Sequence, residues 1–153
     1  MQTQCRQLTV ILTVLGLVLL TGTTSHGGQG ESLCVDAAPP VPAITDGGQN
    51  NVVTITLDDG DYGGSVADWW LLAEAMGTWY SWYSDGSPMG AWTPGIIVSH
   101  IGPLGDVATP FPVLDTTQLA PGIPVSIYFG VDLTPDGIVT LDLLAYDMVT
   151  VAN

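Results

Sequence analysis

The stretch from Val125 to Val151 constrains the fold of this chain more than any other. Apolar residues alternate along Val125–Val131, a Pro-Asp-Gly sequence follows at residues 135–137, and a second apolar run ends in Val149 and Val151. Alternation with a period of two is typical of a half-buried strand, and Pro, Asp and Gly favour turns. The sequence therefore predicts a β-hairpin with acidic residues at its tip.

Further short strands are predicted upstream of this hairpin. Alternation over Val52–Leu57 indicates one strand. Residues Ala67–Met76 include helix formers, yet they lie between glycine-rich loops and lead into the aromatic run Thr78–Ser84, which favours two consecutive strands. Shorter strands are expected at Ile96–His100 and Phe111–Leu114. Seven or so short strands and no long helical period predict an all-β fold, an antiparallel β-sandwich of the immunoglobulin-like or jelly-roll type.

The N-terminal third predicts a secreted protein. Arg6 is followed by an apolar run at residues 8–20 and by small residues at 21–25, which is the layout of a signal peptide and is short for a membrane span of about 20 residues. We therefore expect a signal peptide at residues 1–25, with an uncleaved anchor as the alternative. A flexible Gly- and Pro-rich arm is expected at 26–50 and the sandwich domain at 51–153.

The charge balance excludes several function classes. The chain has fifteen Asp and Glu against a single Lys or Arg, which is Arg6 in the predicted signal peptide. Binding to nucleic acid or to anionic membranes relies on Lys and Arg, so neither is expected. The carboxylates of the domain must be solvated, capped by backbone N–H groups, protonated or bound to a cation from solution.

The cysteines exclude an internal disulfide in a processed chain. Cys5 lies in the predicted signal peptide, which leaves Cys34 alone. We expect Cys34 to be a free thiol or to link two chains, and Glu31–Leu33 does not fit the lead-in of a lipid anchor. Self-association through Cys34, or through an arm at residues 31–50 that pairs with a neighbour's sheet edge, is a second alternative for the role of the protein.

The predicted domain contains a set of short motifs: Ala-Asp-Trp-Trp at 67–70, Gly-Thr-Trp-Tyr-Ser-Trp-Tyr at 77–83, Tyr-Phe-Gly-Val-Asp at 128–132, Asp-Gly at 136–137 and Tyr-Asp at 146–147. Together they resemble a module of secreted bacterial surface proteins that recurs near their C-terminal ends. The resemblance covers about residues 51–151. It implies a β-sandwich and an extracellular setting at the bacterial cell surface, and it implies no enzyme activity.

Two acidic loops are candidate calcium sites. The hairpin tip places Asp132, Thr134 and Asp136 at alternating positions before Gly137, which matches the first half of a calcium loop. Position twelve of that pattern is Leu143 rather than a Glu, so Asp142 is considered as a further ligand and an ordinary metal-free turn remains the alternative.

The second loop has a denser cluster of acids. Asp58, Asp59 and Asp61 lie within four residues, and Asp68 is in reach if the loop folds back. Ca²⁺ is the cation that such oxygen ligands favour, and a solvated loop is the alternative.

Aromatic residues are concentrated in one predicted strand. Trp79 and Tyr83 should point to one face and Tyr80 and Trp82 to the other. Rings on an outward face would form a carbohydrate-binding surface, whereas rings on the inward face would pack in the core.

Catalysis has little support in the sequence. His100 is the only histidine of the predicted domain, and the one acid pair considered for a glycosidase is Asp68 with Glu74. We therefore expect a non-catalytic extracellular module with a structural, adhesive or assembly role, stabilised by Ca²⁺. Its expected partners are other cell-surface proteins or extracellular polysaccharide, and carbohydrate binding through the exposed Trp and Tyr is the main alternative.

Overall fold

A computed structural model describes residues 37–139 and 144–153 of the chain. The predicted signal peptide, Cys34, Asp142 and Leu143 lie outside these residues. The strands are β1 (Val41–Thr45), β2 (Val52–Asp58), β3 (Val66–Ala75), β4 (Thr78–Tyr83), β5 (Ala91–Pro94), β6 (His100–Pro103), β7 (Val107–Asp115), β8 (Val125–Asp132) and β9 (Leu144–Val151), with short 3₁₀ helices η1 (Gly48–Asn50), η2 (Gly60–Tyr62) and η3 (Thr116–Gln118).

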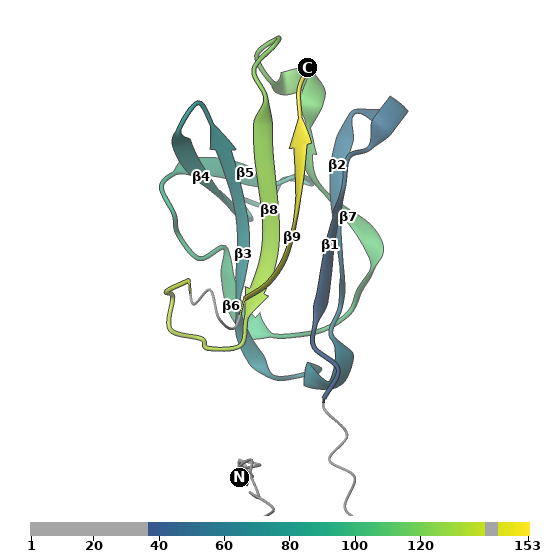
Figure 1. The fold of residues 1–153 in the computed structure, drawn as a ribbon, viewed down its shortest axis with the longest axis vertical. Helices are drawn as coiled ribbons and strands as arrows, with labels where there is room; N and C mark the ends of the chain where they lie inside the picture. The colour runs from purple at the N-terminus through teal and green to yellow at the C-terminus, as the bar shows by residue number, and fades with distance from the viewer. Residues whose placement is uncertain (1–36, 140–143) are drawn as a thin grey trace, which may run out of the picture. The chain divides into compact units, whose positions relative to one another are not determined.

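The strands form two antiparallel sheets that pack face to face, as Figure 1 shows. The smaller sheet has the order β1-β2-β7, and the larger has the order β5-β4-β3-β8-β9, with β6 pairing to the first half of β3. This arrangement confirms the predicted all-β sandwich. Among the described residues, no helix is long and apolar enough to cross a membrane.

The core lies between the inner faces of the two sheets. In β8, the alternating residues Val125, Ile127, Phe129 and Val131 are buried in it. In β2 of the smaller sheet, every second residue is buried as well. The remaining core residues come from both sheets and one loop: Ile44, Val53, Ile55, Leu57, Ala67, Leu71, Ala73, Leu104, Val113 and Val151. The period-two alternation in the sequence therefore marks the inner faces correctly.

The predicted hairpin is confirmed, but its tip differs from the prediction. β8 and β9 pair from Val125 opposite Val151 to Asp132 opposite Leu144. Residues 133–139 belong to neither strand, so the hairpin does not close at the Pro-Asp-Gly sequence in a tight turn. Residues 133–139 instead fold back toward β3, where the backbone N–H of Gly137 donates a hydrogen bond to Asp68.

The choice of two strands for residues 67–84 is also confirmed. β3 and β4 pair from Leu72 opposite Ser81 to Ala75 opposite Thr78. Met76 and Gly77 form the connection with φ of 53° and 78°. Two positive φ angles are those of a type I′ turn, whose twist matches that of the strands it joins.

Two details of the predicted organisation are wrong. Val41–Thr45, which falls in the predicted arm, forms strand β1 and pairs with β2, so the domain begins before residue 51. The backbone N–H of Ile44 also donates to the Asp147 carboxylate of β9 at 3.0 Å, which links the edges of the two sheets. The strand predicted at Ile96–His100 instead begins at its last residue, as β6.

Candidate functional site

The outer face of the larger sheet carries the groups of greatest functional interest. Because alternate residues of β3 and β8 point into the core, the residues between them point outward. Strand register arranges these outward residues in four rows across β3, β8 and β9: Glu74, Ser126 and Thr150; Leu72, Tyr128 and Met148; Trp70, Gly130 and Tyr146; and Asp68, Asp132 and Leu144. The outer face therefore changes from polar, through aromatic, to acidic along the strands.

The β3 and β8 residues of the two middle rows form the floor of an open apolar groove of about 610 Å³; they are Trp70, Leu72, Tyr128 and Gly130. Trp79 of β4 lines it at one side and Tyr146 of β9 at the other, and the segments around Ile96 and Ile138 contribute further apolar side chains. Ile138 is 66% exposed and Tyr146 58% exposed. A contiguous exposed apolar surface marks a binding site more often than single, scattered apolar residues do.

Two features shape the groove. The rings of Trp79 and Tyr128 pack against each other, with centroids 5.4 Å apart and planes tilted by 39°. Gly130 lies between Trp70 and Tyr146, and a Cβ atom at this position would come within 2.8 Å of the Tyr146 Cβ. Because glycine has no side chain, the groove is deeper at Gly130, between the rings of Trp70 and Tyr146.

The four predicted ligand-binding aromatics divide between the two faces as the alternation predicts. Trp79 lines the groove, and Tyr83 is 44% exposed but outside it. Tyr80 and Trp82 instead pack against the core. The Trp82 indole donates a hydrogen bond to the Met89 carbonyl at 2.6 Å, and its ring meets Phe111 edge to face. Of the four, only Trp79 is placed to contact a ligand in the groove.

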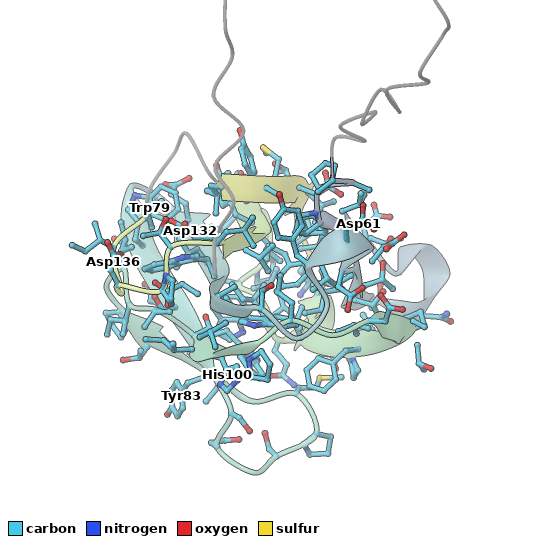
Figure 2. All side chains as sticks on the ribbon, turned by 90° about the horizontal axis from the view of Figure 1, so that it is seen from below. Asp61, Trp79, Tyr83, His100, Asp132 and Asp136 are labelled. Atoms are coloured by element: carbon cyan, nitrogen blue, oxygen red, sulfur yellow. The ribbon has the colours of Figure 1, made fainter. Side chains whose placement is uncertain are left out.

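The acidic row lies at one end of the same face. Asp68 and Asp132 are register partners on β3 and β8, and neither has exposed surface (0% each). Asp136 of the connecting loop is exposed, and its carboxylate accepts a hydrogen bond from the Ile138 N–H at 2.8 Å. Figure 2 shows Asp132 and Asp136 close to each other, with Asp61 on a different side of the domain.

Asp68 therefore does not join the loop at residues 58–61, contrary to the folded-back arrangement considered from the sequence. In that loop Asp58 and Asp59 are instead joined by Asp106, with one carboxylate oxygen of each lying within 4.8 Å of the others. Asp61 accepts a hydrogen bond from the Ala38 N–H at 2.7 Å.

No Lys or Arg side chain is available to neutralise this exposed cluster, since the only one in the chain is Arg6. The pKa of Asp59 is raised from its usual value by desolvation first, and then by the charge of Asp106 and a hydrogen bond with it. Exposed carboxylates of this kind are readily satisfied by water and salt, so the cluster alone does not define a metal centre.

The acid pair considered for a glycosidase is not assembled. Asp68 and Glu74 lie six residues apart on one strand, which separates them by about 20 Å, whereas glycosidase carboxylates lie about 5–9.5 Å apart. The Glu74 carboxylate instead accepts a hydrogen bond from the Gly77 N–H in the β3–β4 turn. His100 is exposed, and its ring packs edge-on against Trp69 at 6.4 Å.

Several residues of these sites were not identified from the sequence. Trp70, Tyr128 and Tyr146 belong to the groove, and Asp106 belongs to the exposed acid cluster. Tyr128 and Tyr146 alternate with core residues along their strands, which is the signal that could have placed them on the outer face. No local pattern identifies Asp106, because Asp58 and Asp59, its neighbours in space, are far from it in the sequence.

Comparison of the chain with known protein families, with curated proteins and with solved structures finds no match in any of the three. The functional interpretation therefore depends on the geometry of the two sites on the outer face.

Proposed function

We propose that this chain is a secreted, non-catalytic adhesive module of the bacterial cell surface, and that the aromatic groove on the outer face of its larger sheet binds extracellular polysaccharide. The observation that carries the proposal is the grouping of Trp79, Tyr128 and Tyr146 along one open groove. Aromatic rings held rigidly on a sheet offer large contact areas at little cost in conformational entropy.

The row next to the aromatic rings supports a sugar ligand. Glu74, Ser126 and Thr150 lie side by side on the same face, and Glu74 is also the register partner of Trp79. The Ser126 and Thr150 hydroxyls are 3.0 Å apart. A sugar ring has an apolar face that can stack on aromatic rings and hydroxyl groups that can bond to such polar side chains. The groove and this row together offer both kinds of contact.

The charge of the domain bears on which polysaccharide it could bind. The described residues contain no Lys or Arg, since the only one in the chain is Arg6, so attraction to anionic polymers is not available. The proposal therefore favours a neutral polysaccharide, recognised by stacking and hydrogen bonding, over a sulfated or carboxylated one.

Titration of the full chain with a panel of neutral and acidic polysaccharides, followed by tryptophan fluorescence and calorimetry, tests the proposal. Replacing Trp79 by Ala should weaken binding of a neutral polysaccharide about tenfold or more, as expected for a central aromatic contact. Tyr83→Ala is the matched control, because Tyr83 is an exposed ring of the same strand outside the groove. The proposal fails if no polysaccharide binds, or if both variants lose the same affinity.

A further inference from the structure

We propose that Asp68 and Asp132 hold a buried Ca²⁺ ion that fastens residues 133–139 to the outer face of the larger sheet. The proposal does not depend on which ligand the groove binds, although the fastened segment includes Ile138, which lines the groove. It begins from the position of the two acids. Each is fully buried, and they face each other across β3 and β8, where cross-strand Cβ atoms are about 4.5–5.5 Å apart.

The loop at residues 133–139 buries Asp68 and Asp132 on the outer face of the larger sheet. The Asp68 Oδ2 atom accepts hydrogen bonds from the backbone N–H groups of Asp136 at 3.1 Å and Gly137 at 2.6 Å. The Asp132 Oδ1 atom accepts one from the Thr134 N–H at 2.8 Å. Both carboxylates thus hold the backbone of the same loop, which in turn excludes water from them.

One oxygen of the pair points to a ligand. The Asp68 Oδ1 atom is buried and has no hydrogen-bond partner among the described residues. A carboxylate without access to water is costly unless it is paired, and like charges directly opposite on a sheet repel each other. No Lys or Arg lies in the described part of the chain to relieve this. A bound cation would satisfy the Asp68 Oδ1 atom and remove the repulsion together.

The ligand chemistry favours Ca²⁺. The side chains that face each other here are two carboxylates, so the donors that they offer are oxygen atoms. Ca²⁺ accepts six to eight oxygen ligands in flexible geometry, whereas Mg²⁺ requires a near-octahedral site and retains water. The hairpin tip has the first half of a calcium loop at residues 132–137 but Leu143 at position twelve. Asp68 brings a further carboxylate to that half-loop from a separate strand.

Thermal unfolding of the full chain in Ca²⁺ and in chelator, at equal ionic strength, tests the proposal. Ca²⁺ at a hundredfold excess over its dissociation constant should raise the Tm by about 10 °C. Asp68→Asn keeps the side-chain shape and an oxygen acceptor but removes one charge, so it should abolish the shift. In chelator this variant should be at least as stable as the wild type, because the repulsion is gone. Asp59→Asn, in the exposed cluster, is the matched control and should keep the full shift.

Terbium luminescence gives a second reading that does not depend on unfolding. Tb³⁺ occupies calcium sites and is sensitised by a nearby indole, and Trp70 lies two residues from Asp68 on the same face, at about 7 Å between Cα atoms. Excitation of tryptophan should therefore give terbium emission that Ca²⁺ displaces and that Asp68→Asn and Asp132→Asn abolish. Coincident melting curves in Ca²⁺ and chelator overturn the proposal, as does a response lost in Asp59→Asn but kept in Asp68→Asn.

Discussion

Replacing Ile44 by Ala should reveal whether Val41–Thr45 belongs to the folded domain. Ile44 is 7% exposed and contacts the core from strand β1. The change removes three carbon atoms, which is about 2.5 kcal/mol of lost transfer free energy at about 0.8 kcal/mol each. A cavity term adds to this, and relaxation at the sheet edge reduces it. We therefore expect the free energy of unfolding to fall by about 3 kcal/mol.

Urea denaturation followed by tryptophan fluorescence measures this loss. With an m-value of about 2 kcal/mol/M for a domain of this size, the midpoint should fall by about 1.5 M. Val41→Ala is the matched control on the same strand, because Val41 is 58% exposed and surface substitutions usually change stability by less than about 0.5 kcal/mol. Equal and small effects of the two substitutions would show that residues 41–45 are an arm, and would refute the placement of β1.

Three further changes test other parts of the structure. Met76 is 81% exposed with φ of 53°, a conformation that Asn tolerates better. Met76→Asn should therefore raise the free energy of unfolding by about 0.5–1 kcal/mol and raise the urea midpoint with it; a lower midpoint would contradict the type I′ turn. Hydrogen bonds from Thr117 lower the pKa of Asp115 in the folded state. The ionised Asp115 carboxylate therefore stabilises the fold at pH values above its usual pKa of 3.8, and this stabilisation is lost as the pH falls through the lower pKa of the folded state. Asp115→Asn should therefore lose less stability than the wild type between pH 5 and about pH 2.5, and an equal loss in urea titrations at the two pH values would contradict this. Gly130→Val should fill the groove floor, and because its Cβ would come within 2.8 Å of the Ala145 backbone oxygen it should also strain the β8–β9 pairing. In a variant that circular dichroism shows to be folded, polysaccharide binding should weaken about tenfold or more; unchanged affinity would place the ligand elsewhere.

The strands that alternate clearly could be predicted from the sequence, and those defined by tertiary contacts could not. β2 and β8 follow the alternation of their residues, since half of each strand faces the core, whereas β3 and β4 were predicted from the glycine-rich loops around them and the aromatic residues of 78–84. β1 was missed because Pro- and Gly-rich residues surround it and only Pro42 and Ile44 of its five residues are buried. Its position depends on pairing with β2 and on the hydrogen bond from Ile44 to Asp147, neither of which leaves a local signal.

The candidate sites show the same limit. The sequence identified Trp79, Asp68 and Asp132 as residues of interest, yet it grouped Asp68 with the wrong loop. Asp68 and Asp132 are separated by most of the domain in sequence and meet only because β3 pairs with β8 in one particular register. A shift of β3 or β8 by one residue would turn every side chain of that strand to the other face and would move its acid into the core.

The position of the ligand on the outer face can be tested most directly by nuclear magnetic resonance of the tryptophan indole N–H groups. The chain has five tryptophans. Trp70 and Trp79 line the groove, whereas the indoles of Trp82 and Trp92 donate to the Met89 and Val113 carbonyls away from it. On addition of a neutral polysaccharide, the indole signals of Trp70 and Trp79 should shift while those of Trp82 and Trp92 stay in place. A shift confined to Trp82 and Trp92, or no shift at saturating polysaccharide, would contradict the proposed binding face.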